Sequence, residues 1–137
     1  MTPEKLCELA KEAMQHAYVP YSGYKVGAAL LCADGTVYQG CNIENAAFSP
    51  TVCAERTAIF KAVSEGVREF EKIAVVGGKN CNVTELFMPC GVCRQVMAEF
   101  CDDSFEIIVA KSCDDYKAFT LCEILPERFS KNNVSEE

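Results

Sequence analysis

Two short stretches carry the residue types that could bind and use a metal ion. In the first, Cys53 is followed two residues later by Glu55, and in the second, Cys90 and Cys93 follow Pro89 in a Pro-Cys-x-x-Cys motif. Three thiolates can hold Zn²⁺ and leave its fourth position open, which distinguishes a catalytic zinc from a structural one. The two stretches together therefore predict a catalytic zinc on these three cysteines, with the glutamate outside the ligand set.

Glu55 is the candidate proton carrier of this site. Zinc lowers the pKa of a bound water to about 7, and a nearby carboxylate can take the water's proton and pass it to a ring nitrogen of the substrate. Attack of water at an amino-bearing ring carbon, with loss of ammonia, is the chemistry typical of this motif pair. A glutamate at a helix start could alternatively serve only as a partner of the helix dipole.

Arg56 and Arg94 each follow closely after a predicted ligand. Three thiolates around one Zn²⁺ leave a net negative charge, which weakens the Lewis acidity of the metal. A guanidinium that donates hydrogen bonds to a ligand sulfur would restore part of it. Each arginine could instead be a surface charge or a member of an ion pair.

A second group of polar and aromatic residues precedes the first cysteine of the motif. Asn42 and Glu44 are two residues apart, so in an extended segment both point to the same face. A carboxylate beside an amide suits a pair of sugar hydroxyls, but a polar loop with solvated or capping side chains is an equal alternative. Tyr24 belongs either to a packed aromatic loop or to one wall of a ligand pocket.

The elements that must position these residues follow from the spacing of apolar side chains. The 3.6-residue period predicts helices over 3–17, from 53 to a stop at Gly66, over 90–100, and a short turn near 123–125. Runs of β-branched and apolar residues predict strands over 25–31, 37–41, 73–76, 105–110 and 116–121. Two of the three ligands thus begin helices, where the positive helix end lowers the pKa of a thiol.

This order of elements predicts one α/β domain over residues 1–137, a three-layer α/β/α sandwich with a mixed sheet of about five strands. A hairpin at 33–36 makes the first two strands antiparallel, and the helical crossovers that follow predict a largely parallel remainder. The polar segment 131–137 is expected to be frayed.

Composition narrows the class of partner. The formal net charge is −7, which disfavours nucleic acid as a partner because phosphate-backbone binding needs a basic patch. The sequence shows neither a leader nor an apolar run of membrane-spanning length, so we expect a cytoplasmic protein with no membrane association. In a reducing compartment, clustered cysteines bind metal or are buried. Seven of the ten cysteines are expected to be small buried side chains: Cys7, Cys32, Cys41, Cys81, Cys101, Cys113 and Cys122.

The chain also resembles a known family, the small homotetrameric zinc-dependent cytidine deaminases. Five motifs in order carry the resemblance over nearly the whole chain: AYVPYS at 17–22, VGAALL at 26–31, GCNIENAA at 40–47, CAERTA at 53–58 and PCGVCRQV at 89–96. The resemblance implies hydrolytic deamination of cytidine and 2′-deoxycytidine to uridine and 2′-deoxyuridine, in pyrimidine salvage. It implies one Zn²⁺ per chain on the three cysteines, with the proton shuttle on Glu55.

The same resemblance implies roles for residues around the metal. It assigns a ribose hydroxyl to Asn42 and Glu44, and the base carbonyl to the backbone N–H of Ala54. Tyr24 occupies a position that is usually aromatic in the family. Arg56 matches the position that compensates the thiolate charge.

Two positions concern the edges of the implied site. Phe48 stands where the family often has tyrosine, so this chain lacks the hydroxyl that a tyrosine would offer there. Family members lend a C-terminal aromatic to a neighbour's site, and Phe129 is the candidate for this role in a homotetramer.

Three other interpretations remain open at this point. The same chemistry could act on a nucleotide, a tRNA base or a cytosine-bearing antibiotic. A fourth ligand, from Cys41 or Cys81, would close the site and make it a non-enzymatic zinc module. A redox role for the Cys90–Cys93 pair is the weakest of the three, because metal-blocked thiols would not cycle.

Overall fold

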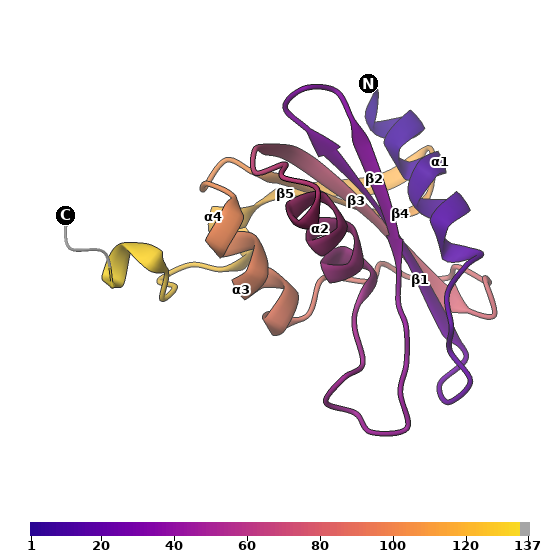
Figure 1. Ribbon diagram of the computed structural model, residues 1–137. Helices are drawn as coiled ribbons and strands as arrows, with labels where there is room; N and C mark the ends of the chain where they lie inside the picture. Colours follow the sequence, from indigo (N-terminus) through magenta and orange to yellow (C-terminus); the bar gives the residue numbers. More distant parts are fainter. Residues whose placement is uncertain (135–137) are drawn as a thin grey trace.

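The computed structural model describes residues 1–134 and contains a five-stranded sheet with helices on both faces (Figure 1). In chain order the elements are α1 (Pro3–Met14), β1 (Tyr24–Cys32), β2 (Val37–Cys41), α2 (Ala54–Ser64), β3 (Phe70–Lys79), α3 (Gly91–Phe100), β4 (Glu106–Ser112), β5 (Asp115–Thr120), α4 (Leu121–Ile124) and the 3₁₀ turn η1 (Lys131–Asn133). The segment expected to be frayed thus begins with an ordered turn, and positions 135–137 lie outside the described residues.

The first helix begins as its sequence predicts and ends earlier. The Thr2 hydroxyl accepts a hydrogen bond from the Lys5 backbone N–H at 3.1 Å, and a proline occupies the first turn. The helix stops at Met14 instead of position 17. The reason is that Tyr18 forms an isolated bridge with Ile43, which draws the chain toward the segment after β2.

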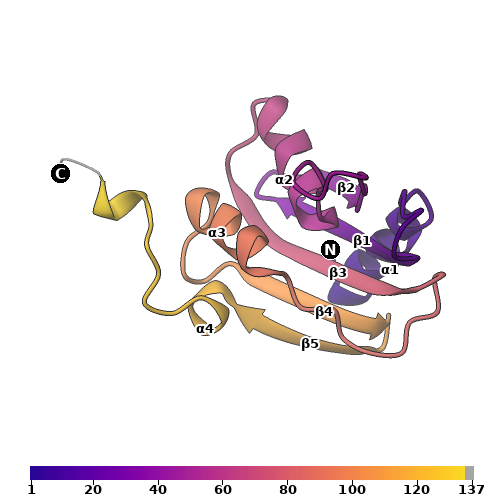
Figure 2. The same cartoon turned by 90° about the horizontal axis from the view of Figure 1, so that it is seen from below.

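The sheet has the order β2-β1-β3-β4-β5, and the expectation of a largely parallel remainder is wrong (Figure 2). Among the five strands within residues 1–134, only β3 and β4 pair in parallel, whereas β1–β2, β1–β3 and β4–β5 are antiparallel. The α2 crossover does join two strands of the same direction, β2 and β3. They flank β1 on opposite sides, so each meets β1 as an antiparallel neighbour. The tight connection between β4 and β5 makes a second hairpin.

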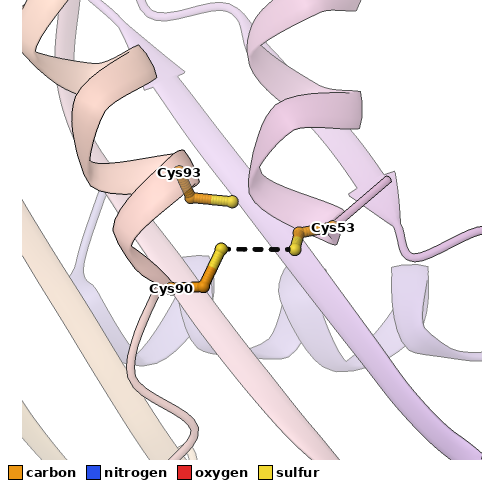
Figure 3. A group of neighbouring side chains, drawn as sticks. All are labelled: Cys53, Cys90 and Cys93. Carbon is orange, nitrogen blue, oxygen red and sulfur yellow. Dashed lines mark hydrogen bonds between the residues drawn. The ribbon is translucent and has the colours of Figure 1, made fainter. Parts of the chain in front are cut away.

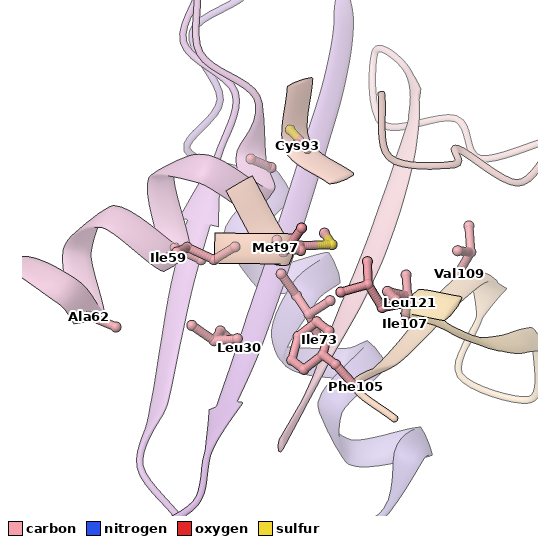
Figure 4. Packing of buried hydrophobic residues seen from close by; sticks show 14 residues of the cluster. Leu30, Ile59, Ala62, Ile73, Cys93, Met97, Phe105, Ile107, Val109 and Leu121 are labelled. Atoms are coloured by element: carbon pink, nitrogen blue, oxygen red, sulfur yellow. The ribbon is translucent and has the colours of Figure 1, made fainter. Parts of the chain in front are cut away.

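Alternate residues of the central strands face two separate cores. Ala29, Leu31 and Ala74 face α1, and Ala28, Leu30 and Ile73 face α2 and α3 (Figure 4). This period-two alternation is what a sheet covered on both faces requires. The observed three layers therefore agree with the predicted sandwich. None of the helices within residues 1–134 combines the length and the apolar character needed to cross a membrane.

The helix that carries the first half of the metal motif lies unusually close to the sheet. A Cβ built on Gly40 of β2 would lie 2.5 Å from the carbonyl oxygen of Ala54 and 2.5 Å from the backbone nitrogen of Ala58. Both obstacles are backbone atoms of α2, which cannot rotate away. Glycine at position 40 therefore sets the depth at which α2, with Cys53 at its start, rests on the sheet.

We predict that Gly40→Ala lowers the free energy of unfolding by about 3 kcal/mol or more, because the methyl group would push α2 off the sheet. Urea unfolding followed by circular dichroism measures the effect. Gly91→Ala is the matched control, because nothing lies within 4 Å of its added Cβ. Equal stability of Gly40→Ala and the wild type would contradict the close packing described here.

Candidate metal centre

Two helix starts bring the three predicted ligands together. Cys53 is the N-cap residue of α2, Cys90 is the N-cap residue of α3, and Cys93 lies in the first turn of α3. Figure 3 shows the three side chains pointing toward one another across the gap between the two helices. Neither N-cap side chain hydrogen-bonds to its own helix, so both sulfurs are directed at the shared space.

The spacing of the sulfurs fits a tetrahedral zinc ion. The three Sγ atoms lie within 4.8 Å of one another, and the Cys53 and Cys90 sulfurs are 3.7 Å apart. Zn–S bonds of about 2.3 Å in tetrahedral geometry separate two sulfurs by about 3.8 Å. The side chains are therefore already arranged as a zinc site needs them, with one Zn²⁺ per chain.

The donor set is open on one side. Among the residues that the structure describes, the cluster contains these three thiols and no fourth His, Cys, Asp or Glu. Cys41 and Cys81, the two candidates for a closing ligand, are not part of it. This composition favours a catalytic site over a closed structural one.

Glu55 lies beside the sulfurs and is almost entirely buried, with 4% of its surface exposed. Burial, helped by the negative charge of Cys53, raises the pKa of its carboxyl to about 7, against the opposing effects of a backbone hydrogen bond and the Arg56 guanidinium. A carboxyl that titrates near neutral pH can both accept and release a proton during turnover. The predicted proton carrier thus has the required environment.

The thiols themselves are unequal before metal binds. A hydrogen bond from the Cys93 thiol, together with donation from Arg56, lowers the pKa of Cys53 to about 5. The same hydrogen bond, burial and the nearby Glu55 carboxylate raise the pKa of Cys93. A metal ion that binds here therefore meets Cys53 as a thiolate, whereas Cys93 must lose its proton on binding.

The two arginines that follow the ligands have different partners. The Arg56 Nη2 donates to the Cys53 sulfur at 3.4 Å, as predicted for a residue that offsets thiolate charge. Arg94 instead donates to two backbone carbonyls, those of Pro89 and Ile124, each at 2.7 Å. Donation to a ligand sulfur, one of the roles left open for Arg94, is therefore not the one observed, because its guanidinium bonds these two carbonyls.

Asn42 and Glu44 lie in one hydrogen-bonded network with the segment around Tyr24. The Asn42 Oδ1 accepts from the Val26 backbone N–H at 2.9 Å, and its Nδ2 donates to the Tyr24 carbonyl at 2.8 Å. The Ser22 hydroxyl donates to the Glu44 carboxylate and accepts from the Tyr24 N–H. These side chains therefore brace the β1 start, and this bracing is the structural role that the sequence left open.

Ser22 is the residue of this network that sequence reasoning did not single out. The backbone N–H groups of Tyr21 and Ser22 also donate to Glu44, at 3.0 and 3.1 Å. The hydrogen bonds of Ser22 lower the pKa of the Glu44 carboxyl, so it stays an acceptor at neutral pH. The sequence does carry one sign of this role for Ser22, namely a hydroxyl placed between a proline turn and Gly23.

Tyr24 is held by contacts that no local pattern could reveal. Its ring lies 5.8 Å from the Phe87 ring, centroid to centroid, and the Lys79 ammonium lies 5.7 Å from its centroid. The residue is still 42% exposed, so its role as a pocket wall stays a prediction.

The two remaining candidates lie at opposite extremes of burial. Ala54 is fully buried and is the first residue of α2, so the helix itself cannot satisfy its N–H. Phe129 is 66% exposed and belongs to the C-terminal segment, which leads away from the sheet in Figure 1. The Gln95 side-chain amide donates to the Phe129 carbonyl at 2.8 Å.

The other seven cysteines follow the burial expectation only in part. Cys7 and Cys32 are buried, and Cys122 is exposed. The rest are partly buried: Cys41, Cys81, Cys101 and Cys113. The exception at Cys122 arises because it lies in the one-turn helix α4, at the surface.

Comparison with known proteins gives the family of the chain. The sequence model of the family described as "Cytidine and deoxycytidylate deaminase zinc-binding region" matches residues 1–109. The cytidine deaminase of Sporosarcina psychrophila is 52% identical over 98% of this chain and 96% of its own, and that of Halalkalibacterium halodurans is 45% identical over 99% and 100%. The crystal structure of cytidine deaminase from Burkholderia pseudomallei matches with a TM-score of 0.87 at 44% identity, over 94% of this chain and 100% of that one. With the three thiols in place on the same fold, the chain belongs to the cytidine and deoxycytidylate deaminase zinc-binding family.

Proposed function

We propose that the protein is a zinc-dependent hydrolase that converts cytidine and 2′-deoxycytidine, with water, to uridine or 2′-deoxyuridine and ammonia, a reaction of pyrimidine salvage. The observation that carries this proposal is the open three-sulfur cluster with the buried Glu55 carboxyl beside it. Relatives named as cytidine deaminases at up to 52% identity support the choice of nucleoside.

The residues of the chain divide the reaction between binding and proton transfer. When bound, zinc supplies the Lewis acidity that makes water a nucleophile near neutral pH. Glu55 takes a proton from that water and delivers it to the ring nitrogen next to the amino-bearing carbon. A further proton moved by the same carboxyl lets the amino group leave as ammonia. The pKa of about 7 suits each of these transfers.

Substrate binding is assigned to the groups around this centre. The Ala54 N–H, at the positive end of α2, donates to the carbonyl oxygen of the base. Glu44 and Asn42 bind a ribose hydroxyl with the hydrogen-bonding capacity that remains after they brace the chain. Tyr24 forms an aromatic wall of the pocket.

The assembly proposed for the chain is a homotetramer in which sites are shared between subunits. Phe48 and Phe129 are 86% and 66% exposed, and both lie on segments that project from the body of the molecule in Figure 1. Large apolar side chains on projecting segments are typical of surfaces covered by a partner. The three thiolate ligands also need a reducing environment, which supports a cytoplasmic location.

We predict that Glu55→Gln keeps one zinc per chain and loses about 10²-fold to 10⁴-fold in turnover, because it removes the proton carrier without removing a ligand. Metal analysis measures the zinc, and loss of cytidine absorbance with ammonia release measures turnover. Assays with deoxycytidine and deoxycytidylate identify the substrate class. Absence of nucleoside turnover by the zinc-replete wild type would refute the proposed function.

A second prediction concerns the stability of the zinc-free protein. The pKa of Glu55 rises from 4.5 to about 7 on folding, so the folded state holds its proton more tightly than the unfolded state. The resulting cost is absent below about pH 4.5, grows as the pH rises, and is complete above about pH 7, at up to about 3 kcal/mol. Glu55→Gln removes this cost.

The zinc-free Glu55→Gln variant should therefore gain stability over the zinc-free wild type as the pH rises from about 4.5 to about 7. Urea unfolding of both proteins across this range measures the difference. Glu8→Gln on the exposed side of α1 is the matched control for the loss of one carboxylate. If the difference in the free energy of unfolding between the two proteins stays constant with pH, Glu55 is not buried as described.

A third prediction tests the shared site. Phe129→Ala should lose about 5-fold to 100-fold in kcat/KM, the usual effect of removing an aromatic that stacks on a base. Mixing its subunits with those of Glu55→Gln should restore activity, because about a quarter of the sites would combine the wild-type form of each residue. The control is a mixture of Glu55→Gln with the variant that carries both Glu55→Gln and Phe129→Ala, in which no subunit supplies Glu55. Activity no greater than the sum of the two parents would place Phe129 outside its neighbour's site.

A further inference from the structure

The three ligands differ in how firmly the fold holds them. Cys93 is buried in the core beneath α3, Cys53 is partly buried, and Cys90 is exposed. Cys90 is also the last residue of the irregular connection between β3 and α3, which spans positions 80–90. Packing therefore fixes the first two sulfurs, whereas the position of the third depends on the peptide groups on either side of it.

Arg94 holds both of those peptide groups. Its side-chain Nε donates to the Pro89 carbonyl at 2.7 Å, and its backbone N–H donates to the Cys90 carbonyl at 3.0 Å. The backbone bond is the ordinary hydrogen bond of an α-helix, which any non-proline residue at this position would make. The side chain therefore adds the hold on the peptide group that precedes Cys90. The side chain closes a small ring around the start of α3.

A second nitrogen of the same guanidinium donates to a different helix, α4. Its Nη1 donates to the Ile124 carbonyl at 2.7 Å, and Ile124 is the last residue of α4. The last carbonyls of a helix have no partner within it, so this hydrogen bond also completes α4. Arginine presents its Nε and Nη1 donors in a fixed planar fork, so one side chain serves both acceptors, whereas lysine has a single donor nitrogen at the end of a flexible stem.

We propose that Arg94 is a positioning residue whose side chain keeps Cys90 in the zinc site by fixing the peptide group that precedes it and bracing that group against α4. It acts through backbone carbonyls, whereas Arg56 acts on a ligand sulfur. The inference deepens the proposed function, since it rests on the same zinc site. Its direct consequence is the retention of metal, which can be measured without any substrate.

The test is the rate at which a chelator removes zinc from the loaded protein. Arg94→Met loses both side-chain hydrogen bonds, and Arg94→Lys keeps the charge and can reach one carbonyl. Zinc release should accelerate about 10-fold to 100-fold in Arg94→Met, the usual range for losing support around a ligand, and less in Arg94→Lys. If the methionine variant does not fold, the lysine variant decides the outcome.

Arg68→Met is the matched control. Arg68 also donates to backbone carbonyls, those of Val63 and Val67, but at the end of α2 farthest from Cys53. Its loss should leave zinc release at the wild-type rate. Equal acceleration in Arg68→Met and the Arg94 variants, or no acceleration in the Arg94 variants, would overturn the proposal.

The absorption spectrum of the cobalt-substituted protein provides a second readout. Displacement of Cys90 should weaken the thiolate-to-cobalt bands in the Arg94 variants and leave them unchanged in Arg68→Met. Unchanged bands in the Arg94 variants would count against the proposal. Should the wild type fail to turn over cytidine while the Arg94 variants still release zinc faster, the proposed function would be wrong and the role of Arg94 would stand.

Discussion

The fold depends at its centre on one spatial constraint, the meeting of two helix starts on the same face of the sheet. Cys53 and Cys90 are the N-cap residues of α2 and α3, and their sulfurs lie 3.7 Å apart. Zinc tolerates little error in this distance. The depth of each helix on the sheet therefore has to be fixed by packing, which explains why Gly40 lies directly beneath α2.

The same constraint places the reactive carboxyl. A residue two positions after an N-cap lies in the first helical turn, and α2 lies so close to the sheet that this turn is buried. Glu55 thus becomes an almost fully buried carboxyl, and burial is the main cause of its pKa of about 7. Its burial and its place in the same helical turn as Cys53 both follow from the position of α2 on the sheet.

Sequence reasoning identified the residues whose role follows from neighbours in the chain. Cys53 and Glu55, like the Cys90–Cys93 pair, are separated by only a few residues, and the apolar spacing that follows each group indicates a helix start. Strand pairing was harder, because α2 joins β2 to β3 across β1, and no local pattern shows that a strand lies between them. The contact of Tyr24 with Phe87 and the hydrogen bond from Arg94 to Ile124 span 63 and 30 residues, so only the folded chain reveals them.

Long-range contacts of this kind form two separate supports around the three-cysteine cluster. On one side, Ser22, Asn42 and Glu44 bind the chain around Tyr24 into one network. On the other side, Arg94 and Gln95 connect α3 to the C-terminal segment through the carbonyls of Ile124 and Phe129. Both supports use side-chain donors or acceptors against backbone groups, an arrangement that fixes main-chain position without adding a ligand. The zinc ligands can therefore remain three in number while the segments around them are held in place, which leaves the fourth position for chemistry.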